Sequence, residues 1–285
     1  AFTNNITEGD GGSAHTIFKD EIDWCKKANA NYSVTGNLWA PDVIWDENYK
    51  NSDGTTGAWL MYMSINGPKW NSTISLLTSD RLDGNWTYVG PVIQSGMSNG
   101  FGPTFDYEKV TGGTDMDRYT SNIRNGNPTM EAHAIDPCVL YDENGDLWMM
   151  YGSWSGGISM IKLDKETGRR DYSTTYTNTN NTVGADGLIV DPYTGYKLAG
   201  GNQQSGEGTY VKKIGGYYYM FLSYGGYAPD GGYNMRVFRA DDIKGPYKDL
   251  AGNDARYVVN NRAGNTTGTT GMRIMSYYKW NFADY

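Results

Sequence analysis

The chain has 285 residues, of which 38 are glycine, and a formal net charge of −8. This length is enough for one large domain with a hydrophobic core. An acidic balance without a run of Lys or Arg makes nucleic acid and anionic membranes poor partners. The two cysteines, Cys25 and Cys138, are too few for a disulfide scaffold and lack metal-ligand spacing. We recognise no signal peptide and no apolar run of about 18 residues, which a membrane-spanning helix needs.

The first part of the chain precedes any repeated pattern. Residues 1–12 are polar and glycine-rich and do not look like the start of a domain. Residues 17–31 have a loosely helical spacing of apolar positions, which predicts a surface helix or loop.

Three later segments then follow one plan. Each has a carboxylate, a short β-type run, a turn and a second β-type run that ends at a serine. A third strand is predicted after each serine, at residues 73–77, 158–163 and 234–239. Two of the segments continue into a related closing phrase, at 79–90 and 240–250. The segments are 39–64, 133–153 and 207–223, and their carboxylates are Asp42, Asp136 and Glu207.

Repetition of a β-meander unit is the signature of a β-propeller. The repeats lie near 37–90, 133–163 and 205–250, within a single predicted domain, 1–285. The first strand of each propeller blade is innermost, so we expect the three acids in equivalent positions at one end of the axis. For any single acid, a turn-capping role at the start of its strand is equally open. Residues 94–132 and 164–202 are predicted to be mainly loops, with an outer strand at 187–191.

The chain is rich in aromatic residues, with 24 Tyr and 9 Trp. Tyr and Trp are good strand formers, and they also stack on sugar rings. Composition alone leaves both roles open.

The motifs LWAPDV, AIDP, YGSW, GEG and GPY, in this order and spacing, resemble glycoside hydrolase family 43, and within it the endo-1,5-α-L-arabinanases. The resemblance runs from about residue 37 to residue 250. It implies an all-β, five-bladed β-propeller that is incomplete at both ends in this chain. It also implies hydrolysis of α-1,5-L-arabinofuranosyl linkages with inversion. Glu207 of GEG corresponds to the general acid, and Asp136 of AIDP to the residue that orients and tunes that acid.

The chemistry of inversion agrees with these roles. It needs a protonated carboxyl at the leaving oxygen and a carboxylate that activates water on the opposite face of the sugar. Glu207 lies between Gly206 and Gly208, which lack side chains and let a bulky polymer approach. A nearby aspartate would disfavour ionisation of Glu207 by like-charge repulsion. The glutamate would then keep the proton that general acid catalysis requires.

Further positions are candidates for contact with the substrate. By the resemblance, Trp39 lines the cleft, and Ser153 and Trp154 form a substrate-contact pair. For Trp70, stacking on a sugar and capping the core are equally open. His133 can bind a sugar hydroxyl or cap a strand, and as a lone histidine it is a weak metal ligand. The full set is Trp39, Trp70, His133, Ala134, Ile135, Ser153, Trp154 and Tyr224.

The sequence departs from the family pattern in two places. No HDP-like motif, which would carry the general base, precedes WAPD, since His15 is followed by Thr16 and Asp10 lies in a glycine-rich stretch. Asp42 is expected to be a structural aspartate at the start of its strand and not the base. The histidine that family members place near an axial calcium ion on the fifth blade also has no counterpart.

We therefore expect part of a longer, extracellular protein, whose propeller is completed by a missing segment or a second chain. The resemblance makes an axial calcium ion a candidate cofactor, without assigned ligands here, and predicts no organic cofactor. Because the base is missing, a non-catalytic carbohydrate-binding propeller is an alternative. Exo-arabinofuranosidase and β-xylosidase activities also stay open, since loop lengths do not show whether the cleft is open at both ends.

Overall fold

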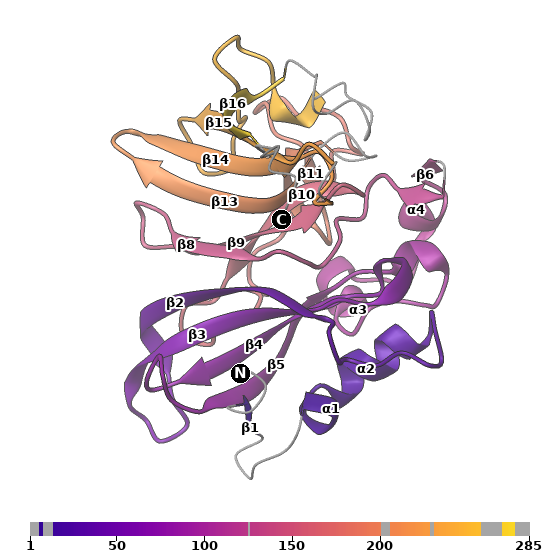
Figure 1. Cartoon of the computed structure of the whole chain (residues 1–285), viewed down its shortest axis with the longest axis vertical. Coiled ribbons are helices and arrows are strands. Elements are labelled where there is room, and N and C mark those ends of the chain that lie inside the picture. The colour runs from indigo at the N-terminus through magenta and orange to yellow at the C-terminus, as the bar shows by residue number, and fades with distance from the viewer. Residues whose placement is uncertain are drawn as a thin grey trace, which may run out of the picture.

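Three sheets form the body of the protein. The structure, a computed structural model, describes residues 6–7, 14–124, 126–200, 206–228, 231–257 and 270–276. From bottom to top of Figure 1 lie the sheets that begin with β2 (Leu38–Lys50), β8 (Cys138–Tyr141) and β13 (Glu207–Ile214). These three strands are edge strands of their sheets, and β8 contacts both β2 and β13. The all-β prediction is therefore confirmed, and the described sheets do not close into a ring.

The first sheet has the strand order β1-β5-β4-β3-β2. Its pairs are antiparallel except for the parallel pair of β1 and β5. The predicted strands are confirmed, and the closing phrase after residue 79 supplies most of β5. The strands besides β2 are β1 (Ile6–Thr7), β3 (Thr56–Ile65), β4 (Thr73–Ser79) and β5 (Trp86–Gln94).

The second sheet has the order β11-β12-β10-β9-β8. The predicted hairpin is confirmed, but the outer strand is not where we expected it. Only Val190–Asp191 of residues 187–191 is a strand, and a strand that the sequence did not reveal pairs with β10 instead. Gly195, where that strand begins, has no room for a side chain, because a Cβ there would lie 2.1 Å from the backbone oxygen of Met160. The strands besides β8 are β9 (Leu147–Ser153), β10 (Gly157–Leu163), β11 (Val190–Asp191) and β12 (Gly195–Ala199).

The third sheet has the order β13-β14-β15-β16. Its fourth strand comes from near the C-terminal end and not from the closing phrase at 240–250. That phrase meets β15 only through a bridge between Arg239 and Lys248, and Pro246 within it has no N–H to donate to a ladder. The strands besides β13 are β14 (Tyr217–Tyr224), β15 (Asn234–Ala240) and β16 (Met272–Ser276).

Two short helices cover the outer face of the first sheet, and the second of them lies within residues 17–31, where the spacing predicted a surface helix or loop. They are α1 (Ala14–Ile17) and α2 (Lys19–Lys26). Ile22 and Cys25 of α2 are buried with apolar side chains of β3 and β4. The carboxylate of Glu21 accepts hydrogen bonds from the hydroxyls of Ser75 and Tyr88 at 2.7 Å and 2.6 Å. No described helix is long and apolar enough to cross a membrane.

Residues 94–132 are more ordered than the predicted loops. Tyr107 and Tyr119 bury their rings between the first and second sheets, and the hydroxyl of Tyr119 donates to Asp191 at 2.6 Å. These anchors follow no helical or strand period, so the sequence did not show them. The elements are η3 (Met97–Asn99), α3 (Tyr107–Thr111), α4 (Asp117–Thr120), β6 (Ile123–Arg124) and β7 (Asn127–Pro128). Elsewhere in the described ranges, short 3₁₀ helices lie at η2 (Pro68–Trp70) and η4 (Ala255–Tyr257).

Candidate active site

Each of the edge strands β2, β8 and β13 has a residue with left-handed backbone at or near its start. These residues are Ala40, Asp136 and Gly208, with φ of 36°, 53° and 63°. Positive φ is readily adopted only by glycine, and at other residues it is sparsely populated and clusters at functional sites. The surroundings therefore hold the backbone of Asp136 in an unfavourable conformation.

The three acids do not occupy equivalent positions, contrary to our expectation. Glu207 comes before the left-handed residue of its strand, Asp136 is that residue, and Asp42 comes two positions after it. Trp39 pairs with Ser64 as Glu207 pairs with Ser223, so Trp39 is the counterpart of Glu207. The left-handed residue is an alanine, an aspartate and a glycine in the three strands. The spacing of the motifs therefore did not show where each acid lies relative to that residue.

Asp136 and Glu207 nevertheless lie close together. Oδ2 of Asp136 accepts a hydrogen bond from the backbone N–H of Gly208 at 3.2 Å. The N–H of Asp136 donates to Oγ of Ser64 at 3.2 Å. Burial, and then the charge of Glu207, raise the pKa of Asp136 to about 6. The predicted proximity of these two carboxyl groups is confirmed.

Two hydroxyl groups lie at the carboxyl of Glu207. Tyr233 donates from Oη to Oε1 at 2.9 Å, and Oγ of Ser153 lies 3.4 Å from Oε2, beyond the usual range of a hydroxyl hydrogen bond. Ser153 was predicted to contact the substrate, and the structure places it at the acid. Tyr233 was missed, because no motif marks it and it reaches Glu207 from the start of a different strand.

Asp42 has the structural role that was expected. Its carboxyl accepts hydrogen bonds from the backbone N–H groups of Val43 at 3.0 Å and Val139 at 2.5 Å. Burial raises the pKa of Asp42. Asp42 thus joins β2 to β8, as Asp136 joins the start of β8 to β13 through Gly208.

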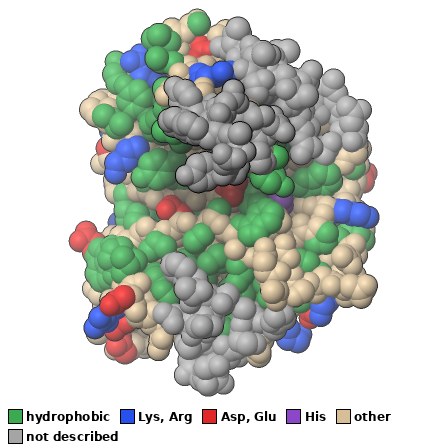
Figure 2. Space-filling view, viewed as in Figure 1, with side chains coloured by type: hydrophobic (Ala, Val, Ile, Leu, Met, Phe, Trp, Pro, Cys, Tyr) green, Lys and Arg blue, Asp and Glu red, His purple; other side chains and the backbone are tan. Residues whose placement is uncertain are grey.

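The residues just before Asp136 lie against loops of the first sheet. Nε2 of His133 is 2.8 Å from Oγ of Ser72, and burial lowers the pKa of His133 to about 4. The N–H of Ala134 donates to Oγ of Ser95 at 2.9 Å, and that hydroxyl donates to the backbone oxygen of Trp70 at 2.6 Å. In Figure 2, acidic side chains (red) and a histidine (purple) lie in the band between the lower and upper parts of this face.

The predicted aromatic and apolar contacts differ in exposure. Trp39 is 45% exposed, whereas Trp154 and Tyr224 are buried between the second and third sheets, edge to face at 6.0 Å. Ala134 and Ile135 are also buried. Contact of these side chains with a sugar stays a prediction.

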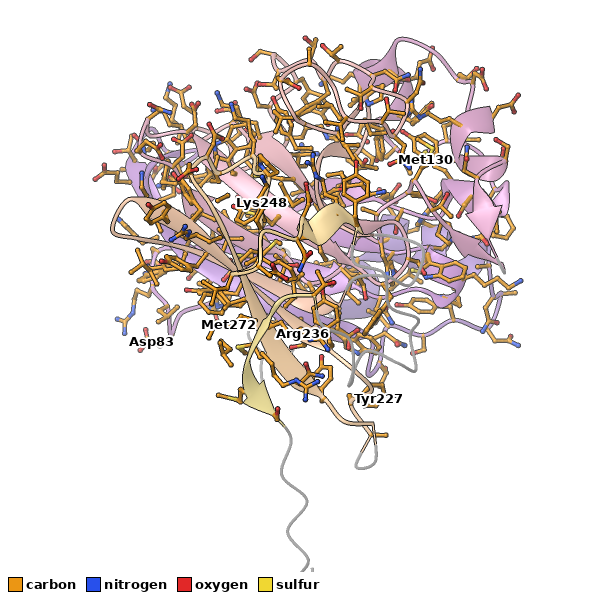
Figure 3. The ribbon with its side chains drawn as sticks, turned by 90° about the horizontal axis from the view of Figure 1, so that it is seen from above. Asp83, Met130, Tyr227, Arg236, Lys248 and Met272 are labelled. Carbon is orange, nitrogen blue, oxygen red and sulfur yellow. The ribbon has the colours of Figure 1, made fainter. Side chains whose placement is uncertain are left out.

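The loop between β14 and β15 exposes another aromatic side chain. Tyr227, which sequence reasoning did not identify, is 88% exposed, and Figure 3 shows it at the outer part of this loop.

Among the described residues we assign no ligands to the axial calcium ion, which stays a prediction. Calcium takes six to eight oxygen ligands, with carboxylates prominent among them. No group of three or more His, Cys, Asp or Glu side chains that could hold a metal is found within the described ranges. Asp10 and the side chain of His15 lie outside the residues that the structure describes.

Carboxyl groups are the catalytic residues of most glycoside hydrolases. Residues 114–272, more than half of the chain, match the family model for glycosyl hydrolases family 43. The chain belongs to this family.

Several known proteins similar to this chain are named as arabinanases. This chain is 33% identical over 239 residues to an extracellular endo-α-(1→5)-L-arabinanase of Thermotoga petrophila. The match covers 82% of this chain and 40% of that protein. The chain is 31% identical to extracellular endo-α-(1→5)-L-arabinanase 2 of Bacillus subtilis, over 80% of this chain and 39% of that protein. The crystal structure of endo-1,5-α-L-arabinanase from T. petrophila RKU-1 superposes with a TM-score of 0.64 at 28% identity, over 92% of this chain and 48% of that one. The chain thus spans less than half the length of these relatives.

Proposed function

We propose that this chain carries the general acid of an endo-acting hydrolase that cleaves α-1,5-L-arabinofuranosyl linkages of arabinan with inversion. The observation that supports this most is the carboxyl of Glu207 beside Asp136, in a family 43 chain. Exo-arabinofuranosidase activity has less support, because both relatives described above are named as endo enzymes. The extracellular names of those relatives support secretion.

The three sheets would be successive blades of a five-bladed propeller. Their adjacent inner strands and the similarity to the arabinanase structure support this arrangement. The axial calcium ion stays a suggestion from the family resemblance, and no step below depends on it.

In the proposed reaction, Glu207 donates a proton to the glycosidic oxygen as the bond to the anomeric carbon breaks. Asp136 fixes the backbone next to Glu207 through the N–H of Gly208. We assign no base among the described residues, because two backbone N–H groups already occupy the carboxyl of Asp42. A binding protein without catalysis is the alternative that follows if no base is present.

The test is Glu207→Gln in the full-length protein. We expect release of reducing ends from linear 1,5-arabinan to fall by about 10²–10⁴-fold, because an amide cannot donate a proton of suitable acidity. Retarded migration in arabinan-containing gels should persist, since the amide keeps the shape of the side chain. The control is Glu166→Gln, which removes only an exposed ion pair with Lys50. Full activity in Glu207→Gln would contradict the assignment, and an inactive parent that still binds arabinan would favour the binding protein.

A further inference from the structure

We infer that Tyr233 is a positioning residue for Glu207, whose phenol holds Oε1 as the acceptor and leaves Oε2 to carry the transferable proton. This inference rests on the proposed function, in which Glu207 is the general acid. The two oxygens of this carboxyl have different surroundings. Oε1 accepts from Tyr233 at 2.9 Å, within the usual range, and Oε2 lies 3.4 Å from Ser153, beyond it.

Tyr233 itself is kept as a neutral donor. Burial, and then the charge of Glu207, raise the pKa of Tyr233 far above its usual value of about 10. Ser223 on β14 pairs with Glu207 on β13. The hydrogen of the phenol points to Oε1 of Glu207. Tyr233 stays protonated near neutral pH, so it is not the base, and with its raised pKa it is too weak an acid to protonate the leaving oxygen efficiently.

The position of the proton on Glu207 follows from this arrangement. A proton on Oε1 would face the phenol hydrogen, so the protonated form carries its hydrogen on Oε2. During cleavage that proton moves from Oε2 to the glycosidic oxygen, which also receives the electron pair of the breaking C–O bond. Glu207 is left as a carboxylate, and the bond from Tyr233 becomes charge-assisted and stronger. An interaction that strengthens as charge develops lowers the barrier.

The chain around Tyr233 is fixed well enough for such a role. The backbone N–H of Gly226 donates to the oxygen of Gly231 at 2.7 Å, and Gly226 and Gly232 form a parallel bridge. The side-chain amide of Asn234 donates to the backbone oxygens of Tyr224 and Gly232 at 3.1 Å and 3.0 Å. Both neighbours of Tyr233 are therefore anchored.

The test is Tyr233→Phe in the full-length protein, which removes the phenol oxygen and keeps the ring. We expect kcat on linear arabinan to fall by about 10–100-fold with KM nearly unchanged, because a hydrogen bond to a charged group is lost. The 4-nitrophenyl glycoside of arabinotriose, whose leaving group needs little protonation, should lose less than about threefold. The alkaline limb of the kcat profile should move to higher pH, because the carboxylate loses a donor.

The matched control is Tyr219→Phe, on β14 opposite Lys212 and Arg239, which should behave like the parent. Equal losses on both substrates without a pH shift would show a merely structural role and overturn the inference. Parent-like kinetics in Tyr233→Phe would overturn it as well.

A second measurement does not require turnover. In protein with carbon-13-labelled glutamate, the carboxyl signal of Glu207 is assigned by its absence in Glu207→Gln. Its titration should move to higher pH in Tyr233→Phe, and an unmoved titration would overturn the inference. An inactive parent would contradict the proposed function, and the titration would then decide the role of Tyr233 separately.

Discussion

At the scale of single residues, Asp136 combines two unfavourable features. Its backbone has a φ of 53°, and burial together with the charge of Glu207 raises the pKa of its carboxyl to about 6. Strained backbone of this kind persists only where the surrounding structure imposes it. The hydrogen bonds from Gly208 and to Ser64 are part of that structure. The position therefore favours function over stability.

This leads to a pH prediction for Asp136→Asn. The pKa of Asp136 is higher in the folded protein than in the unfolded chain, where it is about 3.9, so the ionised carboxyl destabilises the fold. That penalty is complete above about pH 6 and disappears as the pH falls to about 4. Asn carries no charge, so the Tm of the variant relative to the parent should be higher at pH 7 than at pH 4. The difference should be a few degrees, since 1 kcal/mol shifts Tm by about 2–4 °C at this size.

The measurement is thermal unfolding of both proteins across this pH range. His133, whose pKa is lowered to about 4, contributes an opposite slope, because stability is lost as the pH falls from about 6.5 to 4. That slope is common to both proteins and cancels in the difference. A Tm difference that does not change with pH would contradict the prediction.

At the scale of secondary structure, carboxyl groups join neighbouring sheets through backbone N–H groups. Asp42 binds the N–H of Val139 on β8, and Asp136 binds the N–H of Gly208 on β13. Each contact satisfies a donor on an edge strand, which would otherwise need another partner. The two side chains thus hold β2 against β8 and β8 against β13.

Asp42→Ala tests this arrangement. We expect the free energy of unfolding, measured in urea, to fall by about 1–3 kcal/mol, because two backbone donors lose their acceptor. The kcat on arabinan should change little at temperatures where the variant is folded. Asp80→Ala, at an exposed site, is the control. Unchanged stability with a fall in kcat of about 10²-fold or more would instead identify Asp42 as a catalytic base.

At the scale of the whole molecule, the second sheet is the centre of the packing. Every residue of β9 is buried, and successive side chains face different cores. Met149 belongs to the core shared with the first sheet, and Met150 to the core shared with the third. On β14, by contrast, buried and more exposed side chains alternate.

We therefore expect Met149→Ala and Met150→Ala to be about equally harmful. Each should lower the free energy of unfolding by about 2–5 kcal/mol, the usual cost of a cavity at a fully buried site. Leu82→Ala, at a side chain that is 56% exposed, should change it by less than about 0.5 kcal/mol. Urea denaturation provides the comparison. A small effect at either methionine would show that one face of β9 is not part of a packed core.

The sequence by itself determined most of the strands and the acid pair of this protein. Alternating apolar residues and turn signals predicted the hairpin of β8 and β9, and these signals are local, because strand period and turn chemistry depend on neighbouring residues. The repeated plan predicted that Asp136 and Glu207 would meet, because repeated units stack on one another.

Only the tertiary structure decided which distant groups meet. It supplied β12 and β16 as sheet members, placed the three acids at different positions relative to the left-handed residues, and brought Tyr233 to Glu207. The side chain of Asp136 reaches a backbone N–H that is 72 residues away in sequence. Such contacts depend on how the sheets pack, which no local period encodes.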